Sequence, residues 1–146
     1  MDFEDAAQAV LSYLRNRLGF SLWMLAQTRG EHWTVLKTSG GDYGPQPGDT
    51  YRWSSTYCYR MVQGLGPRIA PNSSAVEAYA TVPVPGDFQV GAYVGVPIEG
   101  GGGVLFGTLC AIDPDPQPEA IADELPTVEL MARLLSTVLA KERAGA

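Results

Sequence analysis

Cysteine, histidine and long apolar runs are scarce in this 146-residue chain, and each scarcity excludes a class of protein. The two cysteines, Cys58 and Cys110, lie far apart, so we expect neither a disulfide framework nor a structural zinc site built on C-x-x-C pairs. The only histidine, His32, has no second histidine with which to share a metal centre. No apolar run approaches the roughly 20 residues that cross a bilayer, so we expect no membrane partner.

Basic residues are also few. Ten lysines and arginines stand against sixteen acidic residues, which leaves a formal net charge of -6. That field repels a phosphate backbone, and no local cluster of basic residues offsets it, so a nucleic-acid partner is excluded. Residues 1–5 are acidic and lack the basic start of a signal peptide, which predicts a cytoplasmic protein.

The residues that are abundant predict one folded domain over residues 1–146. Hydrophobic residues make up 45% of the chain, and 17 glycines with 11 prolines indicate many tight connections. Apolar residues at helical spacing predict an amphipathic helix over residues 2–18 and another from Pro118 or Pro126 to the end. The second helix carries a stripe longer than one sheet face covers, so we expect a homodimer through the terminal helices. The stripe contains Val128, Met131, Leu135 and Val138.

Between these helices the pattern is mostly that of β-structure. Strands are expected near 21–28 and 32–38, and apolar alternation over 90–98 leads through glycines 100–103 into a strand at 104–112. Short helices near 55–63 and 75–80 flank a brief strand at 68–70. The order predicts an α+β fold, with an antiparallel sheet, terminal helices packed on one face and short helices over the other.

The two late strands also resemble a known family. Residues 91–98 read GAYVGVPI and residues 105–113 read LFGTLCAID, and together they resemble the last two core strands of GAF domains. WSSTYC at 53–58 and RIA at 68–70 resemble that family's capped helix and middle strand. The resemblance covers residues 5–142. It implies a GAF-like sheet with a ligand pocket beneath the short helices, and terminal helices that form a dimer and relay signals to an output domain.

Within that family, the sequence is closest to GAF sensor domains that precede GGDEF diguanylate cyclase domains. No GGDEF-like segment occurs in the chain, so an output domain would lie beyond Ala146. The resemblance therefore implies a regulatory domain that binds an unknown small molecule and is not an enzyme. The alternative is a ligand-free dimerisation module, in which the pocket is filled by its own side chains.

Cys58 raises an enzymatic alternative. CYRMVQGLG at 58–66 resembles a cysteine-bearing segment of GAF-fold free methionine-(R)-sulfoxide reductases. In that family the catalytic cysteine soon follows the glycines, whereas Pro67 and Arg68 stand here. Such chemistry needs a second thiol, and Cys110 on a predicted central strand is a poor substitute. We therefore expect Cys58 to be a buried structural thiol, with a reductase-like enzyme or relic as the alternative.

No cofactor is identified by the sequence. Photoreceptor GAF domains place a histidine beside the cysteine that attaches bilin, but Tyr59 follows Cys58 here. His32 begins a predicted strand at an exposed turn, which is typical of a surface residue and not of a haem ligand.

The pocket candidates come from the aromatic residues around the predicted sheet. Tyr93 stands between Gly91 and Gly95, which leave its own strand free of bulky neighbours on that face. Tyrosine and tryptophan donate hydrogen bonds from otherwise apolar rings, and arginine holds anionic groups. The candidate ligand-binding residues are Tyr93, Trp53, Arg68, Tyr79 and Cys58. Their donors favour a small ligand with acceptor oxygens.

Overall fold

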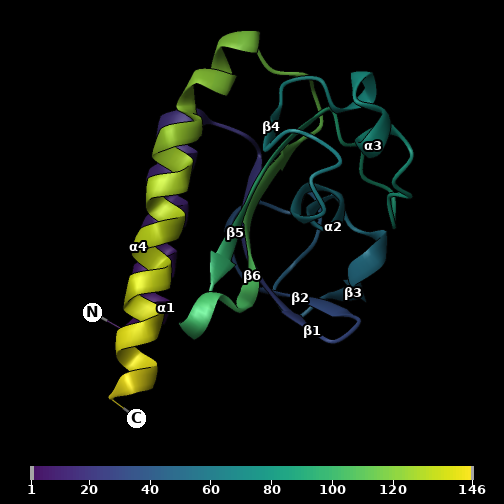
Figure 1. Ribbon diagram of the computed structural model, residues 1–146. Coiled ribbons are helices and arrows are strands. Elements are labelled where there is room, and N and C mark those ends of the chain that lie inside the picture. Colours follow the sequence, from purple (N-terminus) through teal and green to yellow (C-terminus); the bar gives the residue numbers. More distant parts are fainter. Residues whose placement is uncertain (1, 146) are drawn as a thin grey trace.

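The computed structural model describes residues 2–145 and shows one antiparallel sheet with helices on both faces (Figure 1). Its strand order is β3-β2-β1-β6-β5-β4. The strands are β1 (Leu22–Arg29), β2 (His32–Gly40), β3 (Thr50–Arg52), β4 (Ile69–Ala70), β5 (Ala92–Glu99) and β6 (Leu105–Asp113). The helices are α1 (Phe3–Leu18), α2 (Tyr57–Val62), α3 (Glu77–Ala80) and α4 (Leu125–Ala144), with 3-10 turns at Trp53–Ser55, Ser73–Ala75, Gly101–Gly103 and Glu119–Glu124. The α+β fold predicted from the sequence is confirmed.

The two terminal helices lie side by side on one face of the sheet, and they run in opposite directions (Figure 1). At one end the Phe3 backbone N–H donates to Glu142 Oε2 at 2.8 Å, and at the other Arg17 Nε donates to Glu124 Oε2 at 2.7 Å. Asp2 caps α1 by accepting a hydrogen bond from the backbone N–H of Asp5. The first and last helices are therefore tied together at both ends.

The apolar stripe of α4 faces inward. Val128 and Leu135 are fully buried against the sheet and α1, while Met131 and Val138 are half-buried against the same core. The expectation that this stripe extends beyond what the sheet covers is therefore wrong, because these residues pack within the chain itself. The exposed apolar residues of α4 are instead Leu130, at 54% exposure, and Leu134, at 46%.

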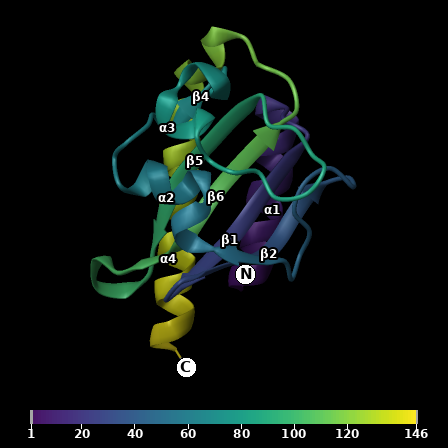
Figure 2. The same ribbon diagram turned by 90° about the vertical axis from the view of Figure 1, so that its right-hand side faces the viewer.

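The opposite face of the sheet carries α2, α3 and long connections, as Figure 2 shows with α4 behind the strands. Alternation along β6 separates the two sides. Leu109 and Ala111 join the core beneath the terminal helices, whereas Cys110 and Ile112 join the core on the α2 side. The sheet thus divides two apolar cores, and a single strand contributes to both.

Most predicted elements are present, with ends shifted by a few residues. The exception is β3, because residues 40–50 were predicted to be a loop that runs directly into the helical region. Thr50 and Tyr51 pair with Thr34 and Trp33 of β2 and extend the sheet at that edge. Three residues are too few to show a period of two, so the sequence carries no signal for this strand. Along residues 2–145, no helix combines the length and apolar character that crossing a membrane requires.

Candidate functional site

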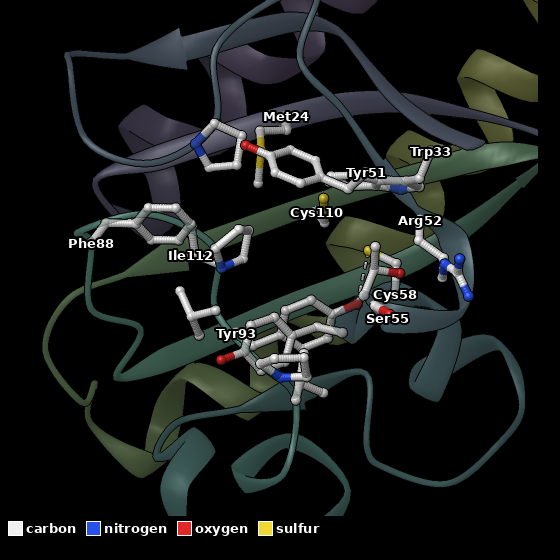
Figure 3. Close-up of a pocket in the computed structure, with 17 residues that line it drawn as sticks. Met24, Trp33, Tyr51, Arg52, Ser55, Cys58, Phe88, Tyr93, Cys110 and Ile112 are labelled. Atoms are coloured by element: carbon white, nitrogen blue, oxygen red, sulfur yellow. Dashed lines mark hydrogen bonds between the residues drawn. The ribbon is translucent and has the colours of Figure 1, made fainter. Parts of the chain in front are cut away.

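A cavity of about 310 Å³ opens on the face of the sheet opposite α1 and α4 (Figure 3). Strands β1, β2, β5 and β6 form its floor. The start of α2 and the loop of residues 82–88 form its walls. The floor residues are Met24, Trp33, Tyr93, Cys110 and Ile112, and the surrounding residues include Tyr51, Tyr57, Cys58, Val84 and Phe88.

The lining of this cavity is strongly apolar. It is built from aromatic rings, aliphatic side chains, two thiols and three prolines, with Ser55 and Thr56 as its small hydroxyl residues. Arg52, which is exposed, is the only charged residue among the described residues that line it. A charged ligand entering such a site would lose hydration without gaining compensating partners. The arrangement therefore suits an uncharged, largely apolar molecule.

Tyr93 lies flat over its own strand. A Cβ atom on Gly95 would stand 1.8 Å from the Tyr93 hydroxyl oxygen, so the ring occupies the space that this glycine leaves. The ring stacks on Tyr57 at 5.5 Å between centroids and meets Tyr79 at 4.9 Å. The space expected above Gly95 is thus filled by Tyr93 itself, and the open cavity lies beside the ring.

Two thiols line the same part of the cavity. The Tyr93 hydroxyl donates to Cys58 Sγ at 3.2 Å, and Cys110 and Thr108 lie near that thiol. Trp33 Nε1 donates to Thr108 Oγ1 at 3.0 Å, which leaves the hydroxyl hydrogen of Thr108 free to point at the thiol. Cys58 therefore accepts a hydrogen bond from Tyr93 and has two further potential donors nearby. Cys110, judged a poor partner from sequence, lies in the same core cluster as Cys58 because its side chain points to the α2 side.

This environment sets the protonation of the pair. Burial alone raises the pKa of the Cys58 thiol, but hydrogen bonds from Cys110, Thr108 and Tyr93 stabilise the thiolate and bring that pKa below its ordinary value. The hydrogen bond to Cys58, together with burial, holds the pKa of Cys110 well above its ordinary value. Of the two thiols, Cys58 is therefore the one that loses its proton more readily.

The aromatic donors keep their protons. Burial raises the pKa of Tyr93 and of Tyr79 above the ordinary value for tyrosine, and the neighbouring Cys58 thiol, when ionised, raises both further. Both phenols remain hydrogen-bond donors at neutral pH. Tyr79 donates to the carbonyl oxygen of Pro67.

Of the five residues predicted to contact a ligand, Tyr93 and Cys58 line the cavity. Tyr79 is buried behind Tyr93. Trp53 is half-buried and packs edge-on against Tyr59. The prediction that one of Trp53, Arg68 or Tyr79 would face the cavity is wrong.

Arg68 lies farthest from its predicted place. It precedes β4 at the edge of the sheet, where its side chain reaches across to α4 and forms an ion pair with Glu129. The attraction of that carboxylate, and the freedom of an edge position, account for the difference.

Several lining residues were missed by sequence reasoning. Trp33 alternates with Val35 on β2 in a pattern that identifies one buried face, so its orientation could have been found from the sequence. Tyr51 lies on the unpredicted strand β3. Phe88 lies in a proline-rich connection, whose path over the sheet has no periodic signal.

A metal centre needs several ligating side chains grouped together. Residues 2–145 contain no group of three or more histidine, cysteine, aspartate or glutamate side chains placed to hold a metal ion. Asp113, the last residue of β6, shapes the turn that follows, because its carboxylate accepts hydrogen bonds from Ser21, Gln117 and the Asp115 backbone.

Comparison with known proteins gives a consistent fold. The family model described as GAF domain matches residues 2–139. No curated protein sequence matches the chain.

Among solved structures, the GAF domain of an Acinetobacter phosphoenolpyruvate-protein phosphotransferase superposes with a TM-score of 0.70 and 16% identity, covering 99% of this chain and 93% of that one. Free methionine-R-sulfoxide reductase from Neisseria meningitidis, solved with its substrate, has a TM-score of 0.70 and 12% identity over 99% of this chain and 89% of its own. The chromophore-binding domain of Stigmatella aurantiaca phytochrome P1 has a TM-score of 0.70 and 16% identity over 96% of this chain and 55% of that chain. The superpositions show a shared fold, and the three proteins differ in what their names say they do.

Proposed function

The chain belongs to the GAF domain family, and we propose on that premise that it is a regulatory sensor domain for a small, uncharged and largely apolar molecule. The ligand occupies the cavity between the sheet and α2. The domain acts in the cytoplasm and is not itself an enzyme.

The observation that carries this proposal is the composition of the cavity. A space of about 310 Å³ walled by aromatic rings and prolines has the size and apolar character of a small-molecule site. Arg68, the residue expected to hold an anionic group, is paired with Glu129 on the other side of the molecule. The sequence led us to expect a ligand that carries acceptor oxygens. We now propose an apolar ligand instead, whose few polar atoms meet Ser55 or Thr56.

Two alternatives are less well supported. In a ligand-free dimerisation module the side chains would fill the pocket, whereas α2 and residues 82–88 leave it open. A free methionine sulfoxide reductase must hold an amino acid with two charged groups, and Arg52 is the only charged residue described in the lining. Pro67 and Arg68 also occupy the place of that family's catalytic cysteine. A turnover assay with free methionine sulfoxide should therefore give no activity above that of a heat-inactivated sample.

Signalling from this cavity would pass to the terminal helices. α4 packs on β5, and β5 and its neighbour β6 both contribute residues to the cavity floor. An output domain such as a diguanylate cyclase, attached after α4, would receive a change in the position or pairing of this helix.

Binding can be tested with 2-naphthol, an uncharged aromatic probe. We expect 2-naphthol to change the fluorescence of Trp33, which lines the cavity, and to raise the melting temperature of the protein. Val84→Trp should fill the cavity and weaken binding at least tenfold, about 1.4 kcal/mol. Val104→Trp is the matched control, because Val104 is 66% exposed in the β5–β6 connection.

The charged analogue 2-naphthoate should bind at least tenfold more weakly than 2-naphthol, since the cavity cannot replace the hydration of a carboxylate. Equal binding of 2-naphthol by the protein and by its Val84→Trp variant would place the probe elsewhere and contradict the proposal.

A further inference from the structure

The arrangement of the two cysteines goes beyond ligand binding. Cys58 from α2 and Cys110 from β6 are separated by 51 intervening residues in sequence, yet both belong to the core cluster on the α2 side of the sheet. The Tyr93 hydroxyl, 3.2 Å from Cys58 Sγ, lies over Gly95, and Gly95 pairs directly with Cys110. Both cysteine side chains are buried, at 2% and 1% exposure, and both line the cavity. Figure 3 shows the two side chains in the same part of the cavity. Small molecules that enter the cavity therefore reach both sulfurs.

The surroundings of the pair make its two members unequal. Cys58 accepts a hydrogen bond from Tyr93 and lies near the hydroxyl of Thr108, whose oxygen accepts from the Trp33 N–H. These donors stabilise negative charge on the Cys58 sulfur, so Cys58 ionises more readily than Cys110. A thiol that ionises readily near a second thiol is the arrangement that two-step thiol oxidation requires.

We propose that Cys58 and Cys110 form a redox site that reacts with small, uncharged hydroperoxides and closes to an intramolecular disulfide between α2 and β6. The site is independent of the ligand proposed above, since it needs only that the cavity admit the oxidant.

In the first step the Cys58 thiolate attacks the terminal oxygen of the hydroperoxide. The O–O bond breaks, Cys58 becomes a sulfenic acid, and the alkoxide that leaves takes a proton from solvent to become an alcohol. In the second step the Cys110 sulfur attacks the Cys58 sulfur. The S–O bond breaks, the S–S bond forms, and hydroxide departs with the Cys110 proton as water. Overall, two thiols lose two electrons and the hydroperoxide is reduced to an alcohol and water.

The cavity also selects the oxidant. Its apolar walls admit an uncharged organic hydroperoxide and disfavour a multiply charged oxidant such as glutathione disulfide. The resulting disulfide would join α2 to the central strand β6. Forming it would require the two sulfurs to close to the S–S distance of about 2.05 Å.

The direct test is oxidation of the full, reduced 146-residue protein. Cumene hydroperoxide should convert it to a product that has no disulfide between chains and in which peptide mapping joins Cys58 to Cys110. Glutathione disulfide at the same concentration should act at least tenfold more slowly. In Cys110→Ser the reaction should stop at a Cys58 sulfenic acid, which dimedone traps.

Tyr93→Phe tests the donor network. Loss of the hydrogen bond to the thiolate should slow oxidation by roughly tenfold. It should also shift the pH dependence of Cys58 alkylation toward higher pH, an effect that loss of packing alone would not produce. Tyr43→Phe is the matched control, because Tyr43 donates to the Gln89 carbonyl and not to a thiol.

In a second experiment, the rate of oxidation by hydrogen peroxide is compared with the rate by cumene hydroperoxide. Equal rates with hydrogen peroxide and cumene hydroperoxide support thiol chemistry but overturn the selection for organic oxidants. The proposal as a whole is overturned if the oxidised wild type contains no Cys58–Cys110 bond. Because this outcome is read from the unaltered protein, it does not depend on whether any variant folds. Binding of 2-naphthol is measured separately, so a failure of the redox proposal is distinguished from a failure of the proposed ligand-binding function.

Discussion

Gly95 shows how one missing side chain shapes the site. It lies on β5 directly beside Cys110 on β6, and the Tyr93 ring lies over it. Any larger residue there would displace the tyrosine hydroxyl from Cys58. The glycine thus controls the packing of the aromatic cluster as well as the hydrogen bond to the thiol.

We predict that Gly95→Ala destabilises the protein by about 1–3 kcal/mol, since the added methyl group forces the Tyr93 ring from its place. Urea denaturation measures this loss. Gly101→Ala is the matched control, because a Cβ at Gly101 meets no atom within 4 Å and should change stability by less than about 0.5 kcal/mol. A Gly95→Ala variant as stable as the wild type would show that the ring moves aside without cost.

At the scale of elements, the sequence predicts what is periodic. β5 and β6 were predicted because alternation and apolar continuity identify strands, and α1 because its buried residues recur at helical spacing. β3 and the path of residues 82–88 have no such period, and together they complete the cavity. The fold was therefore predictable, whereas the cavity lining was predictable only at Tyr93 and Cys58.

Substitutions on α4 test which face of this helix packs against the core. Leu135 is fully buried and Leu134, next to it, is 46% exposed. We predict that Leu135→Ala lowers the free energy of unfolding by about 2–5 kcal/mol, because it leaves a cavity in the core. Leu134→Ala should cost less than about 0.5 kcal/mol in the monomer. Similar losses for both variants, measured by chemical denaturation, would contradict the inward orientation of the stripe.

For the molecule as a whole, we predict a dimer through exposed apolar residues of the terminal helices. Leu130 and Leu134 are exposed on α4, and Tyr13 on α1 is 46% exposed. Phe3 contacts Glu142 and Arg17 contacts Glu124, so along the antiparallel helix pair Tyr13 lies at about the same height as Leu130. These residues offer apolar contacts for a dimer through the terminal helices, in place of the buried stripe.

We predict that the protein sediments as a dimer at high micromolar concentration, and that Leu130→Glu combined with Leu134→Glu converts it to a monomer, because two charges would then be buried in the interface. Leu65→Glu, at a residue 61% exposed on another part of the surface, is the control and should remain dimeric. If the wild-type protein sediments as a monomer under these conditions, the prediction of a dimer through the terminal helices is wrong.

The division of β6 between two cores sets the distance that a signal must travel. Cys110 contacts the cavity, and its neighbours Leu109 and Ala111 contact the core beneath the terminal helices. Adjacent residues of one strand cannot shift independently, because planar peptide bonds join them. A displacement produced on one side of the sheet is therefore delivered to the other across the thickness of a single backbone, and no relay of side chains through the interior is needed.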